Sequence, residues 1–263
     1  MNFFGSKTAA ERYVKGRPDF HANTIARVKT FLEIDQKVPM ALDVACGTGL
    51  SAKALLPIAD EVYATDASPE MLNVAFAKDQ VRYIVAPAEN QPFEDGEFDL
   101  ITVSSALHWF DIDAFLTEAC RLLRTNGWLV IYENNFTGKM EGNDDFKRWV
   151  DEVYLGNFPT PPRNRNYDWS VENLQAKGFS MQVYDEFENE INFDRAQSIS
   201  YFTTQSNVIS AVENKRYTYD KAEQWLDGQL ALYFDRDETV HTFLFVNRIK
   251  FLQKRNIDLN ERY

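Results

Sequence analysis

Residues 41–52 constrain the fold of this chain more strongly than any other segment; they read Ala-Leu-Asp-Val-Ala-Cys-Gly-Thr-Gly-Leu-Ser-Ala. The apolar first half predicts a buried strand that carries one acid, Asp43. Gly47 and Gly49 predict a sharp turn, because residues without a Cβ let the backbone bend tightly and approach a ligand. A helix is expected directly after Gly49. Its free N–H groups and positive dipole end would favour a carboxylate or phosphate.

A second acid, Asp66, ends the next predicted strand, 61–66. A carboxylate in this position can accept hydrogen bonds from both hydroxyls of a ribose. The alternative is an ordinary capping or solvated aspartate. Together with the glycine turn, Asp66 predicts a pocket for a nucleoside-containing cofactor at the edge of a parallel sheet. The spacing Gly47-x-Gly49-x-x-Ala52 also fits a dinucleotide-binding fingerprint, so a dehydrogenase is a competing interpretation.

Strand and helix patterns alternate along the first half of the chain, which indicates parallel strands with right-handed crossovers. The expected fold class is α/β: a doubly wound, seven-stranded, mostly parallel sheet with an antiparallel last strand and a small helical cap. Ser68 is expected to cap the second helix of this region. Strands are predicted over 40–45, 61–66, 81–86, 98–104, 128–133, 181–187 and 239–246, and helices over 9–14, 23–34, 50–56, 69–77, 113–123 and 171–177.

The domain organisation predicted from these patterns has three parts: an N-terminal helical segment over 1–35, a cofactor-binding core over 36–133, and a segment over 134–263 that completes the sheet. The last part carries helical insertions at about 134–168 and 195–235. Basic residues from Arg248 to Arg255 alternate with apolar ones, and we expect them on the solvated face of a terminal helix.

Charge and cysteine content exclude several classes of function. The formal net charge of −12 would repel a phosphate backbone, so nucleic acid is not an expected partner. The two cysteines, Cys46 and Cys120, form neither a disulfide framework nor a zinc-binding spacing, so no metal is expected. No apolar run approaches the roughly 18 residues that span a bilayer, and no signal peptide is apparent. We expect a cytoplasmic monomer or homodimer without membrane insertion.

Five segments, in order, carry a family resemblance: 42–49, 66–71, 88–93, 98–110 and 121–129. With these motifs the chain resembles the class I S-adenosylmethionine-dependent methyltransferases, in particular the small-molecule group that includes trans-aconitate and ubiquinone/menaquinone-type methyltransferases. The segment Thr125-Asn126-Gly127 departs from the Pro-Gly that is usual in the last motif. The position of Asp43 inside the first strand favours a methyltransferase over a dehydrogenase, because a pyrophosphate site has no comparable use for that acid.

The resemblance implies S-adenosylmethionine as the cofactor, with S-adenosylhomocysteine as the product. The glycines would approach the methionyl part, Asp66 the ribose, and the segment from Ala88 the adenine edge. Tyr13 and Arg17 resemble a lid over the cofactor carboxylate; the alternative is plain helix packing with a solvated arginine. The implied cofactor-binding residues are Tyr13, Arg17, Asp43, Ala45, Gly47, Gly49, Asp66, Ala67, Met71, Ala88, Glu89, Ser104 and Ser105.

His108 and Trp109 follow the fourth predicted strand, where the reactive methyl group should point. His108 is a candidate general base or a holder of an acidic substrate; the alternative is a histidine that only shapes the loop. Trp109 is a candidate apolar wall or a ring face for the sulfonium cation. Alignment and exclusion of water supply much of the acceleration in an in-line displacement, so a dedicated base is not required.

Recognition of the acceptor is expected in the two helical insertions, which are rich in aromatic residues. Either these aromatics contact the substrate or they simply pack the cap. The predicted function is methyl transfer to a small molecule, such as a carboxylic acid. A catalytically silent cofactor- or protein-binding domain is the first alternative, and a lipid-cyclopropanating enzyme is the second. The aromatics are Phe146, Trp149, Tyr154, Phe158, Tyr201, Phe202, Trp225 and Tyr233.

Overall fold

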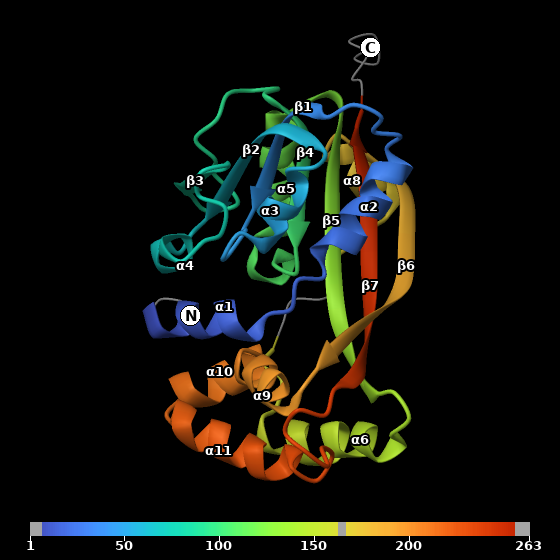
Figure 1. The fold of residues 1–263 in the computed structure, drawn as a ribbon. Helices are drawn as coiled ribbons and strands as arrows, with labels where there is room; N and C mark the ends of the chain where they lie inside the picture. Colours follow the sequence, from blue (N-terminus) through green and yellow to red (C-terminus); the bar gives the residue numbers. More distant parts are fainter. Residues whose placement is uncertain (1–6, 163–166, 256–263) are drawn as a thin grey trace. The chain divides into compact units, whose positions relative to one another are not determined.

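Seven strands form one sheet in the order β3-β2-β1-β4-β5-β7-β6 (Figure 1). The computed structural model describes residues 7–162 and 167–255. Neighbouring strands from β3 to β5 are parallel. The strands are β1 (Val38–Val44), β2 (Ala59–Asp66), β3 (Val81–Val85), β4 (Phe98–Ser104), β5 (Leu123–Met140), β6 (Phe179–Phe193) and β7 (His241–Lys254).

The last strand in the chain, β7, runs antiparallel to both of its neighbours. Near its start, Thr242 O accepts from the N–H of Glu141, the residue after β5, and just after its end Arg255 N–H donates to the carbonyl of Gly178, the residue before β6. The predicted fold class, a doubly wound and mostly parallel seven-stranded sheet with an antiparallel last strand, is therefore confirmed.

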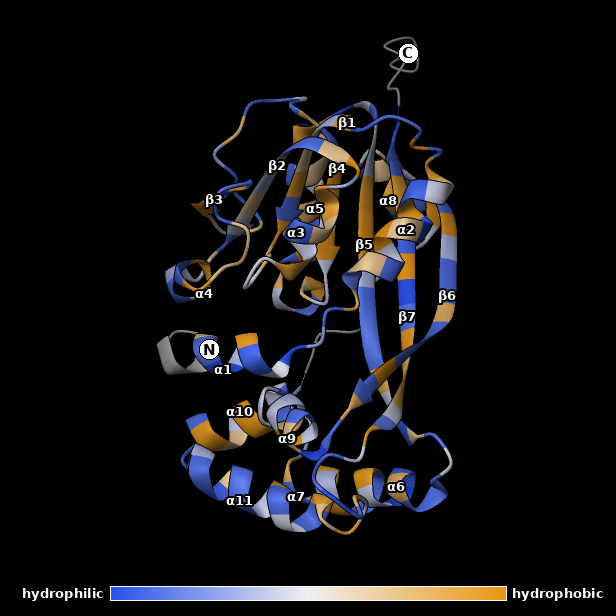
Figure 2. Cartoon of the chain, viewed as in Figure 1, coloured by the Kyte–Doolittle hydropathy of each residue, from blue (hydrophilic) through white to orange (hydrophobic). Residues whose placement is uncertain are grey.

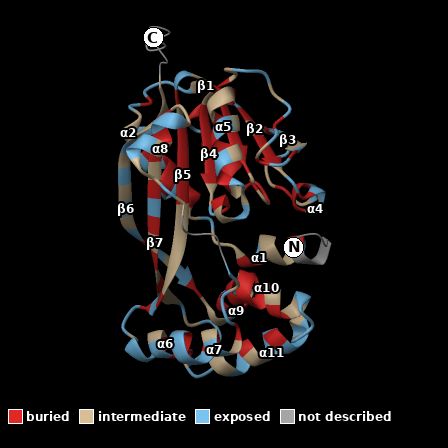
Figure 3. Cartoon of the chain, turned by 180° about the vertical axis from the view of Figure 1, so that it is seen from behind, coloured by how far each residue is buried: buried red, intermediate tan, exposed pale blue. Residues whose placement is uncertain are grey.

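The described part of the chain divides into two compact units, one of which comprises residues 21–133, 167–186 and 247–255. Figures 1 and 3 show α2 and α3 on one face of its sheet and α5 and α8 on the other. Central strand β4 is buried along most of its length. The helical elements of this unit are α2 (His21–Phe31), α3 (Leu50–Leu55), α4 (Pro69–Asn73), the 3-10 turn η1 (Leu107–Trp109), α5 (Ile112–Leu122) and α8 (Val171–Ala176).

Side-chain caps define where two of these helices begin. The Ser68 hydroxyl accepts from Met71 N–H, so the predicted cap of α4 is confirmed. Asp111 accepts from Ala114 N–H at the start of α5. Such caps satisfy N–H groups that have no partner within the helix.

The other unit comprises residues 1–20, 134–162 and 187–246, and has an aromatic core of its own. All eight aromatic residues singled out in the predicted insertions belong to this core, buried or half-buried, with Phe193, Phe243 and Phe245 from β6 and β7. These aromatics therefore pack the unit. Its helical elements are α1 (Lys7–Gly16), α6 (Asp144–Arg148), the π-helical turn η2 (Trp149–Tyr154), α7 (Leu155–Asn157), α9 (Arg195–Thr203), α10 (Ser206–Glu213) and α11 (Tyr219–Leu230).

The unit boundaries differ from the predicted segments at the N-terminus. The sequence placed residues 1–35 together, whereas in the structure α1 and α2 belong to different units. The predicted core ends at residue 133, and a unit boundary lies between residues 133 and 134. None of the described helices is long and apolar enough to cross a bilayer.

The terminal helix predicted for the basic residues after 246 is wrong, because β7 continues to Lys254. Burial alternates along this strand, with Arg248 exposed and Ile249 fully buried. Figure 2 shows the matching alternation of hydrophilic and hydrophobic residues on β7. A period of two residues is the signature of a strand. Two other strands are also longer than predicted. The sequence predicted ends at residues 133 and 187, and β5 and β6 extend well beyond these positions.

Helix α5 ends earlier than the predicted Leu123, and Asn126 lies inside β5 rather than between helix and strand. Asn126 has a left-handed backbone (φ 63°). The pairing of β4 with β5 shifts register around it, from Phe98 opposite Leu123 to Leu100 opposite Trp128. The departure from the usual Pro-Gly therefore accompanies a bulge in the strand.

We predict that Gly16→Ala destabilises the unit built around α1 and α9. A Cβ at this position would lie 2.2 Å from the Ser200 carbonyl oxygen, which is a backbone atom that cannot swing aside. Such overpacking typically costs about 1–3 kcal/mol. Gly228→Ala in α11 is the matched control: nothing lies within 4 Å of its Cβ position, so alanine should add about 0.5–1 kcal/mol of stability. Denaturant unfolding measures both, and equal effects would contradict the packing of α1 on α9.

Candidate functional site

The turn between β1 and α3 is built from left-handed residues. Ala45, Gly47 and Gly49 have φ angles of 54°, 56° and 80°. A Cβ on Gly47 would lie 3.3 Å from the Met71 methyl group, and one on Gly49 would lie only 2.0 Å from the Tyr83 hydroxyl oxygen. Position 49 thus needs a glycine for two reasons: its φ angle is positive, and the Tyr83 side chain leaves no room for a Cβ.

Tyr83 holds this turn from the side of β3, a role that its sequence position did not suggest. Its hydroxyl donates to Phe76 O at 2.7 Å, and Phe76 N–H donates to Thr48 O at 3.0 Å. The segment after α4 is thereby bonded to the middle of the glycine turn. In the sequence Tyr83 is simply an aromatic residue in a strand, and no local pattern marks the contact.

Asp66 joins the turn after β1 to the turn after β2. Its Oδ2 accepts from Gly47 N–H and its Oδ1 from Ser68 N–H, each at 2.8 Å. Burial raises the pKa of Asp66, and these two hydrogen bonds offset part of the rise. A carboxylate has about four acceptor positions. About two therefore remain for a ligand at the carboxyl end of β2.

Asp43 is fully buried in β1, between a helix and the neighbouring strand. Ser51 Oγ of α3 donates to Oδ2 at 2.5 Å, and Thr102 Oγ1 of β4 donates to Oδ1 at 2.7 Å. Loss of solvation raises the pKa of Asp43 to about 7, against the effect of both hydrogen bonds. A nearby cation would favour its ionised form. Ser51 and Thr102 were not among the predicted site residues.

The segment predicted to lie at the adenine edge begins with Ala88, which is buried in the core of the sheet unit. Glu89 Oε1 accepts from Asp111 N–H at 2.9 Å. Since Asp111 caps α5, this bond ties the start of the loop to the start of that helix. Ala67, predicted to flank the adenine, is exposed directly after Asp66, and Met71 is buried.

The predicted catalytic residues lie on the short turn η1 after β4. The His108 and Trp109 rings are 4.5 Å apart between centroids, and Trp109 is 44% exposed. Ser104 ends β4, and Ser105, with a left-handed φ of 53°, donates its N–H to Tyr132 O. Because β1 and β4 are parallel neighbours, these residues lie at the same sheet edge as the glycine turn.

Tyr13 and Arg17 lie in the aromatic unit, so their predicted contact with the cofactor stays a prediction. The Arg17 guanidinium lies 4.7 Å from the centre of the Tyr13 ring, and its Nη2 donates to Thr204 O at 2.8 Å. Its Nε is buried, and no acceptor within the described ranges reaches it.

Comparison with known proteins agrees with the geometry of this sheet edge. Residues 42–131 match the methyltransferase-domain family. A Dictyostelium discoideum protein provisionally named a methyltransferase is 31% identical over 142 residues, which cover 54% of this chain and 52% of that protein. The demethylmenaquinone methyltransferase of Thermotoga maritima is 33% identical over 180 residues, which cover 59% of this chain and 75% of that protein. The chain thus spans about half the length of the Dictyostelium relative.

The fold also has close counterparts among solved structures. A protein of Anaeromyxobacter dehalogenans, provisionally named a type II methyltransferase, superimposes with a TM-score of 0.68 at 21% identity, covering 91% of this chain and 97% of that one. At this identity the likeness concerns the fold alone. The sequence match to the Thermotoga protein extends over three quarters of its length, and the residues that match the methyltransferase-domain family, 42–131, include the glycine turn and both acids. The chain therefore belongs to the class I S-adenosylmethionine-dependent methyltransferases.

Proposed function

We propose that this chain transfers a methyl group from S-adenosylmethionine to a small-molecule acceptor. The observation that carries the proposal is the Asp66 carboxylate, which is bonded to the glycine turn and keeps acceptor positions for a ribose. Family membership supports the cofactor class, and the sheet edge offers groups that match each part of that molecule.

The residues of the sheet unit fit S-adenosylmethionine on physical grounds. Asp66 would accept from the ribose hydroxyls, and Asp43 would favour the methionyl ammonium, directly or through water. Asp43 is a buried carboxyl with a pKa near 7, so a cation beside it would offset the cost of its burial. Gly47 and Ala45 would leave room for the methionyl part, while Ala67, Met71 and Ala88 would offer apolar contacts to the adenine.

Methyl transfer from a sulfonium needs little chemical assistance from the protein. Bound S-adenosylmethionine would supply a methyl group on a sulfonium, which is an excellent leaving group. Ser104 and Ser105 would line that end of the site, and the exposed Trp109 ring would form a wall or face the positive charge. His108 would hold an acidic acceptor or take its proton. Alignment and exclusion of water would supply most of the acceleration.

The placement of His108 and Trp109 next to each other after β4 supports a proposal for the class of acceptor. A polar ring beside an apolar one suits a small acid or a modest aromatic or lipid-like molecule. Formation of S-adenosylhomocysteine with panels of carboxylic acids, phenols and quinols tests this. Cofactor binding without turnover on any panel would favour a silent cofactor-binding domain.

Calorimetric titration with S-adenosylmethionine and S-adenosylhomocysteine tests the proposed cofactor. We expect dissociation constants on the order of micromolar, and none for NAD. Asp66→Ala should weaken binding by about a hundredfold or more, because it removes two charge-assisted hydrogen bonds to the ribose and the carboxylate that joins the two turns. Asp60→Ala is the control, since Asp60 is an exposed acid on the same strand. Binding that survives Asp66→Ala would refute the ribose assignment.

Affinity for S-adenosylhomocysteine should rise with pH up to about 7 and then level off. The ligand ammonium favours ionised Asp43, whose pKa is about 7 in the ligand-free chain. Below that pH, binding must therefore displace a proton, which lowers the affinity. Asp43→Asn should remove this pH dependence between about pH 5.5 and 8. A variant with the same slope as the wild type would show that another group titrates.

A further inference from the structure

We propose that Arg121, acting with Glu118, is a positioning residue that forms the adenine loop before the cofactor arrives. The loop in question comprises residues 86–97, between β3 and β4, and contains Ala88 and Glu89. Neither Arg121 nor Glu118 was expected to serve the cofactor. The inference rests on the proposed function for the assignment of this loop to adenine.

The Arg121 guanidinium bonds the far half of the loop to α5. Its Nη1 donates to Phe93 O at 2.9 Å and to Asp95 Oδ1 at 2.7 Å, and its Nη2 donates to Gln91 O at 3.3 Å. The backbone carbonyl of Arg121 accepts from Gly96 N–H at 2.9 Å. A single residue of α5 therefore contacts the loop at four positions.

Glu118, one turn earlier on α5, orients that guanidinium and adds a loop contact of its own. Its two carboxylate oxygens accept from Arg121 Nε and Nη2, each at 2.8 Å. Glu118 Oε1 also accepts from Gln91 N–H at 2.8 Å. Gln91 is consequently bonded through both its N–H and its carbonyl. The planar five-donor fork of arginine suits this arrangement, and a lysine ammonium does not.

The solvent exposure of Glu118 and Asp95 shows which of these two acidic partners contributes more to holding Arg121. The Glu118 side chain is 12% exposed and that of Asp95 is 80% exposed. Ion pairs in water contribute little, so Glu118 is the significant partner and Asp95 a minor one. The Arg121 side chain keeps the pKa of Glu118 below its ordinary value, so the pair stays ionised at neutral pH.

The near half of the loop is held by the same helix, through the bond from Asp111 N–H to Glu89. α5 and its cap thus hold the loop at Glu89, one of the residues assigned to the adenine edge, and again from Gln91 to Gly96. Ordering a residue's backbone costs about 1–2 kcal/mol. If the loop is already ordered before the ligand binds, this cost is not subtracted from the binding free energy. The affinity for the ligand is then higher.

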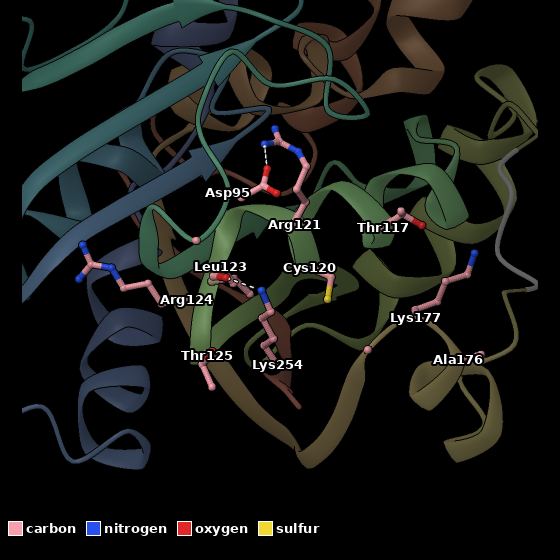
Figure 4. A pocket seen from close by; sticks show the side chains of 12 residues that line it. Asp95, Thr117, Cys120, Arg121, Leu123, Arg124, Thr125, Ala176, Lys177 and Lys254 are labelled. Atoms are coloured by element: carbon pink, nitrogen blue, oxygen red, sulfur yellow. Dashed lines mark hydrogen bonds and ion pairs between the residues drawn. The ribbon is translucent and has the colours of Figure 1, made fainter. Parts of the chain in front are cut away.

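Figure 4 shows a pocket of about 900 Å³ with Arg121 and Asp95 at one side and Lys254 bonded to Leu123 O at another. The pocket lies by the start of β5, at the opposite sheet edge from the glycine turn. Arg121 therefore contacts the loop from the side of the sheet edge that lies opposite the glycine turn. Arg124, which also lines the pocket, pairs with Asp99 and makes no described bond to the loop.

Two measurements test the positioning role without relying on turnover. In the ligand-free wild type, amide hydrogen exchange at Gln91 and Gly96 should be slow, because both N–H groups are bonded to α5. R121Q and E118Q should speed exchange at Gln91 by about tenfold or more, and weaken S-adenosylhomocysteine and 5′-methylthioadenosine alike by about tenfold. R121K should not restore affinity. R124Q, which loses one Arg–Asp pair at the same end of α5, should leave both readouts unchanged.

The outcomes separate this inference from the proposed function. A wild type that binds neither ligand overturns the proposed function and the adenine assignment with it. A wild type that binds both, with R121Q and E118Q within twofold of it, overturns the positioning role alone. Fast exchange at Gln91 in the ligand-free wild type also overturns it, and this arm needs no variant to fold.

Discussion

The carboxylate of Asp66 is the contact on which the candidate site depends. It binds the N–H of Gly47 after one strand and the N–H of Ser68 after the next, each at 2.8 Å. Without it both of these hydrogen bonds would be lost at a partly buried edge, at a cost of about 1–3 kcal/mol each. The same carboxylate thus holds the two turns together. In the proposed function it would also bind the ribose.

Asp43 differs from Asp66, because its burial costs free energy in the ligand-free chain. Burying a carboxyl inside β1 raises its pKa to about 7, which means that the folded chain resists its ionisation. Two hydroxyl donors, Ser51 and Thr102, reduce this cost without removing it. We propose that a positively charged ligand group, such as a methionyl ammonium, completes the surroundings of this acid.

The parts of the site that sequence could predict are those fixed by local spacing. The glycine turn, Asp66 and the segment from Ser104 to Trp109 each follow a strand, and the ends of neighbouring parallel strands meet at one edge of a sheet. Contacts between distant segments could not be predicted this way: Tyr83 against Gly49, Glu89 with Asp111, and Arg121 with the loop. The last strand was predicted over 239–246, but its continuation to Lys254 was missed for the same reason, since its apolar period becomes meaningful only beside β5 and β6.

A structure of the chain with S-adenosylhomocysteine bound tests the central claim most directly. The account predicts both ribose hydroxyls within about 2.6–3.2 Å of the Asp66 carboxylate, with the homocysteine part over the turn at Gly47 and the adenine beside Ala88. The bonds of Asp66 to Gly47 and Ser68 should persist unchanged. A nucleoside seated elsewhere, or an Asp66 that abandons the turn to bind it, would contradict the account.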